Sequence, residues 1–207
     1  MTSSKTDRLA QLRIQVSRCQ KCPALAMSRT QTVFGVGNPD AEFMFVGEAP
    51  GREEDREGEP FIGRAGQFLG ELIRMMGFRR DDVYISNVMR CRPDCDEGNR
   101  KPEWKEMDRC VPYLREEIEI IQPKVIIALG GTAMEGLFGE PCAITRVRGR
   151  KRLYNGFPVM PTFHPAYVLR NADEITLGKI WMDICRAMEI AGYDLKARWD
   201  WRPKIPA

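Results

Sequence analysis

The chain has no long apolar segment. Its 207 residues contain no run of about 18 apolar residues, the length that a membrane-spanning helix requires. The first eight residues are polar and lack the apolar centre of a secretory signal peptide. We therefore expect a cytoplasmic protein without membrane contact. Its length suits a single domain over residues 1–207, with an N-terminal arm (1–30) and a C-terminal tail (192–207).

Histidine occurs once, as His164, and the common nucleotide-binding motifs are missing. There is no G-x-x-x-x-G-K-[ST] phosphate loop. The Gly35-x-Gly37 pair precedes a predicted strand, whereas a dinucleotide-binding fingerprint follows one. No serine or cysteine stands in the sharp turn that presents the nucleophile of an α/β-hydrolase. These absences argue against both kinds of nucleotide site and against that kind of covalent catalysis.

Cysteine, by contrast, is well represented, with seven residues. An odd number in a reducing compartment favours metal binding or burial over disulfides. Cys19 and Cys22 form a C-x-x-C pair, Cys91 directly follows a predicted strand, and Cys110 lies in the next predicted helix. Structural zinc usually takes two tight pairs, and here a long insert splits the second pair. Spacing alone therefore leaves both zinc and an iron–sulfur cluster open.

The remaining cysteines offer weaker signals. Cys95 lies inside the insert between Cys91 and Cys110 and could compete as a ligand. Cys142 and Cys185 have no partner at a ligand-like spacing, so we expect buried thiols or plain surface residues.

Apolar periodicity predicts strands and helices in alternation. The predicted strands are 43–46, 83–86, 125–129, 152–154 and 157–160. The predicted helices are one capped by Thr6, 65–76, 103–121, a short one after Gly131, and 172–190. Asn155-Gly156 is a strong hairpin-turn signal. This alternation indicates the α/β class, with a mainly parallel sheet covered by helices on both faces.

The unusual residues of the chain stand where the predicted strands end. The first strand leads into Glu48, the second into Asn87, the third into Gly130, and the last into His164. Ligands of open α/β sheets bind beyond the carboxyl ends of the strands. We therefore expect these four remote segments to meet at one binding site, although glycine also simply ends strands and a lone histidine is more often structural.

Charge is segregated along the sequence. Between Pro141 and Ala172 every charged residue is basic, whereas five carboxylates crowd residues 53–59. Such a distribution can offer a basic face to an anion and keep carboxylates for a site.

A set of short motifs carries a resemblance to a known family. The motifs are Val46-Gly-Glu-Ala-Pro-Gly51 with Glu53-Glu54-Asp55, Pro60-Phe61-Ile-Gly63-Arg64-Ala-Gly66, Val83-Tyr-Ile-Ser-Asn87, Cys91-Arg-Pro93, Asn99-Arg100-x-Pro102, Thr145-Arg-Val-Arg-Gly149 and Phe163-His-Pro-Ala-Tyr167. In this order and spacing the chain resembles the family 4 uracil-DNA glycosylases, the iron–sulfur branch of the uracil-DNA glycosylase superfamily. The resemblance covers about residues 19–171.

The resemblance implies a three-layer α/β/α sandwich with a central four-stranded, mainly parallel sheet. It implies a [4Fe–4S] cluster on Cys19, Cys22, Cys91 and Cys110. It also implies a DNA-repair enzyme that flips uracil out of single- or double-stranded DNA, hydrolyses its N-glycosidic bond and leaves an abasic site. We expect a monomer that turns over without covalent trapping, because the insert after Cys91 contains no histidine.

The residue chemistry fits a pocket for a flipped base. The expected uracil-binding residues are Gly47, Glu48, Ala49, Phe61, Asn87 and His164. Phe61 would stack on the ring, and the Asn87 amide complements O4 and N3–H of uracil. His164 would donate to O2 as negative charge develops there. The basic residues expected to contact DNA phosphates are Arg146, Arg148, Arg150, Lys151 and Arg170.

The group that activates water is harder to predict. Other branches of the superfamily carry Asp or Asn one residue after the position of Glu48, where this chain has Ala49. Glu48 or Glu54 could orient the water, so we count both, with His164, as candidate catalytic residues. Glu54 could instead form the wall beside C5 and exclude thymine.

Two other functions remain open from the sequence. A redox or charge-sensing module could use the cluster without any need for Asn87 or His164. A glycosylase of broader range could also act on hypoxanthine or xanthine.

Overall fold

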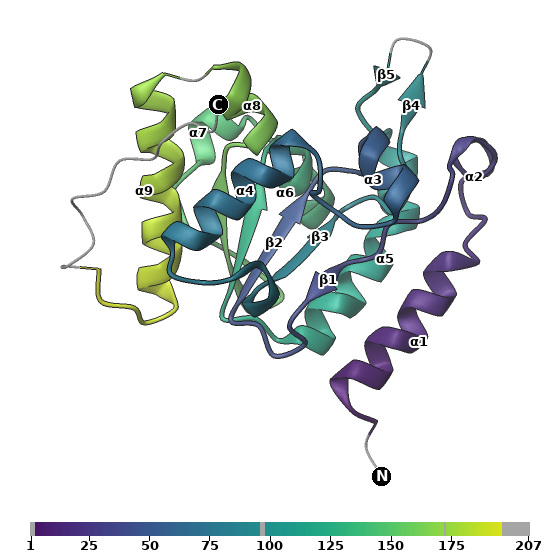
Figure 1. Cartoon of the computed structure of the whole chain (residues 1–207), viewed down its shortest axis with the longest axis horizontal. Coiled ribbons are helices and arrows are strands. Elements are labelled where there is room, and N and C mark those ends of the chain that lie inside the picture. Colours follow the sequence, from purple (N-terminus) through teal and green to yellow (C-terminus); the bar gives the residue numbers. More distant parts are fainter. Residues whose placement is uncertain (1–2, 96–97, 172, 196–207) are drawn as a thin grey trace.

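A six-stranded sheet forms the centre of the molecule (Figure 1). The structure is a computed structural model that describes residues 3–95, 98–171 and 173–195. The strand order is β1-β3-β2-β6-β8-β7. Four strands form the parallel centre: β3 (Tyr84–Asn87), β2 (Phe43–Gly47), β6 (Val125–Leu129) and β8 (Phe157–Thr162).

The expected count of four strands is wrong, because a short antiparallel strand is added at each edge. The two-residue strand β1 (Val36–Gly37) pairs with β3, and β7 (Arg152–Tyr154) pairs with β8. Strand β7 follows from the predicted hairpin turn, since Asn155 and Gly156 adopt φ values of 48° and 87°. Positive φ at both central residues is the requirement of a type I′ turn. The parallel centre itself is as expected.

Alternating residues of each central strand supply two separate cores. Phe43 and Phe45 of β2 point to one face of the sheet, and Met44 and Val46 point to the other. All four side chains are fully buried. Strands with apolar residues on both faces must be covered by helices on both sides.

Two sets of helices provide this cover and complete the α/β/α sandwich that the sequence predicts. One face packs against α1 (Lys5–Ser17), α5 (Trp104–Ile121) and α6 (Gly131–Phe138). The other face packs against α4 (Arg64–Met75) and α9 (Glu174–Ile190). In Figure 1, α1 runs alongside α5 at one side of the molecule, and α9 lies at the opposite side. No helix within the described ranges combines the length and apolar character needed to cross a membrane.

Several short elements were not predicted. They are α2 (Pro23–Ser28), α3 (Arg52–Glu57), η1 (Arg80–Asp82), α7 (Ile144–Val147), α8 (Pro165–Arg170) and the hairpin of β4 (Asp94–Cys95) and β5 (Gly98–Asn99). The prediction that Thr6 caps the first helix is wrong. Ser4 is the cap: its hydroxyl accepts from Asp7 N–H, and the Asp7 carboxylate accepts from Ser4 N–H. Two reciprocal bonds outweigh the single bond that a lone threonine offers.

The sheet register fixes the geometry of the carboxyl edge. Gly47, the last residue of β2, pairs with Asn87, the last residue of β3. Strand β6 ends next to this pair, and β8 ends beside β6. Segments that follow these four strands therefore emerge at one edge.

Two of the isoleucines of α9 allow a test of the second core. Ile180 is fully buried against the sheet, whereas Ile175 on the same helix is 69% exposed. Replacing Ile180 with alanine should lower the free energy of unfolding by about 2–5 kcal/mol, because it leaves a cavity. Ile175→Ala should change it by about 0.5 kcal/mol or less. Urea unfolding midpoints measure both, and equal losses would contradict this packing.

Candidate active site

A cavity of about 340 Å³ lies at the carboxyl edge of the sheet. Its lining residues are Glu48, Ala49, Gly51, Glu54, Phe61, Ala65, Asn87, Asn99, His164, Ala166 and Arg170. The cavity therefore brings together the side chains predicted to share one site, from segments more than 100 residues apart along the chain. Neither Gly47 nor Gly130 is among the lining residues.

Asn87 offers an unused hydrogen-bonding group to this cavity. Its side chain is only 2% exposed, and its Oδ1 has no hydrogen-bond partner in the part of the chain that the structure describes. Gly47 lies directly against it: a Cβ on Gly47 would stand 2.4 Å from Asn87 Oδ1 and 2.4 Å from Phe61 Cζ. The absence of a side chain at Gly47 therefore leaves room for Asn87 and Phe61. A buried acceptor without a partner is costly unless a ligand supplies the donor.

Phe61 forms an aromatic wall in an unusual backbone conformation. Its φ is +55°, a left-handed value that few bulky residues adopt. The backbone at Gly66 approaches so closely that a Cβ there would lie 1.8 Å from the Phe61 carbonyl oxygen. The Phe61 ring lies 5.7 Å from the His164 ring, centroid to centroid, at 31°. The two rings therefore border the same space.

Glu54 holds the loop on which Phe61 sits. Its carboxylate accepts three backbone N–H bonds, from Gly51 at 3.0 Å, Ile62 at 3.1 Å and Gly63 at 3.1 Å. The first is the capping bond of α3, and the other two tie the residues after Phe61 to that helix. The carboxylate lines the cavity, but its acceptor capacity is largely committed to the backbone.

His164 is poised as an uncharged hydrogen-bond donor. It caps the N-terminus of α8, where its Nδ1 accepts the N–H of Ala166 at 3.1 Å. The proton of the neutral ring must then lie on Nε2. Burial, reinforced by the nearby Arg170 charge, lowers the pKa of His164 from 6.5 to about 4, against the opposing effect of Glu54. The imidazole is therefore neutral at physiological pH.

Glu48 is the cavity-lining carboxylate that has no partner among the described residues. It is half-buried, and its side chain forms no hydrogen bond or ion pair with any described residue. Its carbonyl oxygen, by contrast, accepts from Met89 N–H at 3.0 Å, which holds the backbone in place.

Comparison with known proteins identifies the family. The model of the Uracil DNA glycosylase superfamily matches residues 34–185. The chain belongs to this superfamily. A type-4 uracil-DNA glycosylase of Thermotoga maritima is 50% identical over 159 residues, which are 76% of this chain and 81% of that protein. The type-4 enzyme of Archaeoglobus fulgidus is 44% identical over 163 residues, 75% of this chain and 80% of that protein.

A relative named as another type of uracil-DNA glycosylase is less similar to this chain. A type-5 uracil-DNA glycosylase of Pyrobaculum aerophilum is 27% identical over 206 residues, 84% of this chain and 89% of that protein. The higher identity to type-4 proteins confirms the resemblance seen in the sequence motifs.

Asn99 and Arg170 also line the cavity, although the sequence did not predict them as pocket residues. Asn99 arrives on the β4–β5 hairpin, and its Oδ1 accepts from Arg92 Nε at 2.6 Å. The Asn99-Arg-x-Pro102 motif was the available signal, but the hairpin that carries it was not foreseen. Arg170, expected only at the DNA surface, also lines the cavity.

The four cysteines form a group that is separate from the cavity-lining residues. Cys91 and Cys110 are buried, and Cys19 and Cys22 are half-buried. Burial raises the pKa of the Cys91 thiol despite a hydrogen bond from Arg29, and Cys19 and Cys22 raise it further. Burial likewise raises the pKa of Cys110 to about 12, with Cys91 and Cys19 contributing. The four thiols are thus close enough to influence one another.

The described residues contain no group of three or more His, Cys, Asp or Glu side chains arranged to hold a single metal ion. The sulfur atoms nevertheless have donors around them. Arg29 Nη1 donates to Cys91 Sγ at 3.1 Å, and Arg90 N–H donates to Cys110 Sγ at 3.2 Å. The side chain of Cys95 lies outside what the structure describes, whereas Cys142 is half-buried and Cys185 is buried.

The predicted DNA-contacting residues divide into two kinds. Arg146, Arg150, Lys151 and Arg170 are exposed and form no ion pair with a described residue. Arg148 is 15% exposed, and its guanidinium binds both Asp183 oxygens, at 2.6 Å and 2.9 Å, and the Lys179 carbonyl at 2.6 Å. Its contacts anchor the loop before β7 to α9. The tail residues 196–207, including Trp199 and Trp201, lie outside the described residues.

The single histidine makes the charge state of the site directly measurable. An NMR titration of His164 should give a midpoint near pH 4 and not near 6.5. The unfolded chain takes up this proton near pH 6.5 and the folded chain only near 4. The stability that neutral His164 contributes should therefore be complete above 6.5 and decline toward pH 4. A midpoint at 6.5 or above would contradict the neutral ring.

Proposed function

We propose that this chain is a DNA-repair glycosylase that receives a flipped uracil in the cavity, hydrolyses its N-glycosidic bond and leaves an abasic site. The observation that carries the proposal is the buried, unpartnered Oδ1 of Asn87 in a cavity walled by Phe61 and His164. The type-4 names of the relatives support the same substrate. We also propose that this chain acts as a monomer.

Recognition would depend on Asn87. Its Oδ1 would accept uracil N3–H, and its Nδ2 would donate to O4. Cytosine presents an acceptor at N3 and a donor at C4, so both bonds would be lost, at about 1–3 kcal/mol for each unpaired group. Phe61 would stack on the base, and the backbone around Gly47, Glu48 and Ala49 would contact the pyrimidine edge.

Catalysis would come mainly from stabilising the departing base. As the glycosidic bond breaks, negative charge develops on uracil O2, and His164 Nε2–H would donate to that oxygen. A neutral donor already in place needs no proton transfer, and one such bond is commonly worth about 2.7–4 kcal/mol. Its attachment to α8 through Nδ1 supports this orientation.

Glu48 is the better candidate to orient the attacking water. Its carboxylate has no competing partner among the described residues, so it can accept a proton from water. Glu54 is engaged by three backbone amides, which supports the alternative that it walls the cavity and holds Phe61. Asn99 is a further polar group at the cavity, but its oxygen is occupied by Arg92.

DNA would bind across the exposed basic residues. Arg146, Arg150, Lys151 and Arg170 are free to contact phosphates, and Arg170 would connect that surface to the base cavity. We assign Arg148 a structural role, since its guanidinium is committed to Asp183.

We also propose a [4Fe–4S] cluster on Cys19, Cys22, Cys91 and Cys110. Four cysteine sulfurs, of which those of Cys91 and Cys110 accept N–H bonds, fit such a cluster, whose ligands stand further apart than those of one ion. When bound, its iron–sulfur bonds would join the N-terminal arm to the segment after β3 and to α5. None of the four cysteines lines the cavity, which supports a structural role.

The catalytic assignment predicts a large effect of one side chain. His164→Ala should lower kcat for release of uracil from a labelled oligonucleotide by about 10²–10³-fold, because the donor to O2 is lost. Asn87→Ala should lower kcat/KM by about 10- to 100-fold. Asn38→Ala, at the opposite end of β3, is the matched control and should act like the unaltered protein. No abasic product from the unaltered chain would refute the proposed function.

The cluster assignment predicts about four iron atoms per chain in brown protein purified without oxygen. Cys91→Ala and Cys110→Ala should each lose most of this iron, since each removes one ligand. Cys142→Ala removes a half-buried thiol outside the group and should keep it. Elemental analysis is the measurement, and stoichiometric zinc without iron would reject the cluster.

A further inference from the structure

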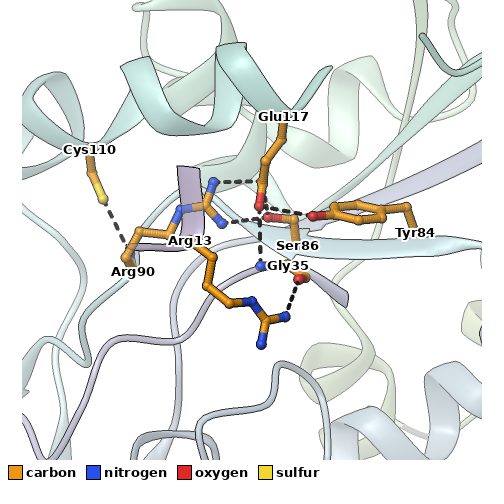
Figure 2. A network of polar contacts seen from close by, with 7 residues as sticks. All are labelled: Arg13, Gly35, Tyr84, Ser86, Arg90, Cys110 and Glu117. Atoms are coloured by element: carbon orange, nitrogen blue, oxygen red, sulfur yellow. Dashed lines mark hydrogen bonds and ion pairs between the residues drawn. The ribbon is translucent and has the colours of Figure 1, made fainter. Parts of the chain in front are cut away.

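A fully buried ion pair joins Arg90 to Glu117 (Figure 2). The Arg90 side chain is 1% exposed and that of Glu117 is 0% exposed, with Arg90 Nη2 and Glu117 Oε2 2.7 Å apart. Arg90 Nη1 donates to Ser86 Oγ at 2.6 Å, and Ser86 Oγ donates to Glu117 Oε2 at 2.7 Å. Glu117 Oε1 accepts from Tyr84 OH and from Gly35 N–H, each at 3.2 Å.

This network lies between the base cavity and the cysteine group. Ser86 directly precedes Asn87 on β3, and Cys91 directly follows Arg90. Arg90 N–H donates to Cys110 Sγ, and Cys110 and Glu117 stand on the same helix, α5. The backbone N–H and the side chain of Arg90 therefore tie the segment 86–91 to α5 at two points, Cys110 and Glu117.

Stability alone does not account for such a pair. Taking two charges out of water costs several kcal/mol for each, and apolar replacements of buried pairs are often neutral or stabilising. Arg90 Nε also lacks a hydrogen-bond partner among the described residues, so the guanidinium is not fully compensated. A pair retained at this cost is better explained by the geometry that it imposes.

Asn87 is the residue whose geometry needs such support. Its Oδ1 makes no hydrogen bond within the described protein. Its position depends on close packing against Gly47 and Phe61 and on the backbone that carries it. The amide N–H groups of Val88 and Met89 donate to the carbonyls of Gly47 and Glu48, which fixes the near side of this segment, and the Arg90 network fixes the far side.

We propose that Arg90 and Glu117 are positioning residues for base recognition, which hold Asn87 in register by clamping the segment 86–91 against α5. The inference rests on the proposed function, since it concerns how Asn87 meets a uracil. It assigns the network no contact with substrate.

The test compares two DNA ligands. One duplex carries a 2′-fluorinated deoxyuridine, whose glycosidic bond resists hydrolysis, and the other carries a stable abasic-site analogue, which has no base to recognise. The variant is Arg90→Met with Glu117→Gln, which removes both charges and keeps an amide oxygen for Gly35 N–H and Tyr84 OH. Its affinity for the uracil analogue should fall by about tenfold, while its affinity for the abasic duplex stays unchanged.

Non-additivity provides the decisive readout. If the network acts through Asn87, Asn87→Ala alone should lose the same selectivity, and adding the network substitutions should lower it no further. Glu42→Gln is the control. Glu42 lies just before β2, at the other end of the sheet, and its carboxylate binds Lys124 and Tyr193. Its substitution should leave the selectivity for the uracil analogue intact. Iron content and the thermal midpoint of each variant show whether the cysteine group and the fold persist.

Several outcomes would overturn the inference. Equal losses for both duplexes, unchanged selectivity, or a further loss in the Asn87→Ala background would each mean that the network only supports the fold. If the double variant does not fold, Ser86→Ala is tested in the same assay. A loss of selectivity would support the proposal, and unchanged selectivity would overturn it. If the unaltered protein does not prefer the uracil analogue to a cytosine analogue, the proposed function itself fails, independently of the network.

Discussion

The pairing of β2 with β3 is the constraint on which the rest of the site depends. It sets Gly47 opposite Asn87, so that the residue without a side chain lies under the one that must reach the cavity. A slip of one residue would bring a Cβ-bearing neighbour into the space that Phe61 and Asn87 now fill. The same register lets the backbone of 47–48 accept from Val88 and Met89. The register of the sheet thus sets the relative positions of Gly47 and Asn87 at the cavity.

Burial acts differently on three of the polar side chains that line the cavity. It keeps His164 neutral, which leaves an uncharged donor on Nε2. It leaves Asn87 Oδ1 without a partner, which makes the pocket favour a donor-bearing base edge. Glu48 is only half-buried, so its carboxylate keeps access to water. The roles proposed for Asn87, His164 and Glu48 in recognition, leaving-group stabilisation and water orientation therefore depend on the different partners of the three side chains.

The sequence was most informative where local periodicity coincides with tertiary structure. The four central strands, the main helices and the meeting of Glu48, Asn87 and His164 followed from apolar patterning and from the rule that parallel strands end at one edge. The β4–β5 hairpin, and with it Asn99 at the cavity, could not be predicted, because its strands are two residues each and carry no period. The contacts of Arg148 and Glu54 could not be predicted either. A run of basic or acidic residues shows that the segment is charged, but only the packing of the folded chain decides which of these side chains turns inward.

In the acidic segment 53–59, two carboxylates bind backbone N–H groups of the protein itself. Glu54 accepts amide bonds on both sides of Phe61, and the neighbouring Asp55, 6% exposed, accepts the N–H of Thr30 at 3.0 Å and 3.2 Å. Helix α3 therefore connects the aromatic wall of the cavity to the arm that follows Cys22. The Arg90 network makes a second connection, from Asn87 to Cys91 and Cys110. Phe61 and Asn87 are thus each connected, through hydrogen bonds of their own segment, to parts of the chain that carry the cysteines.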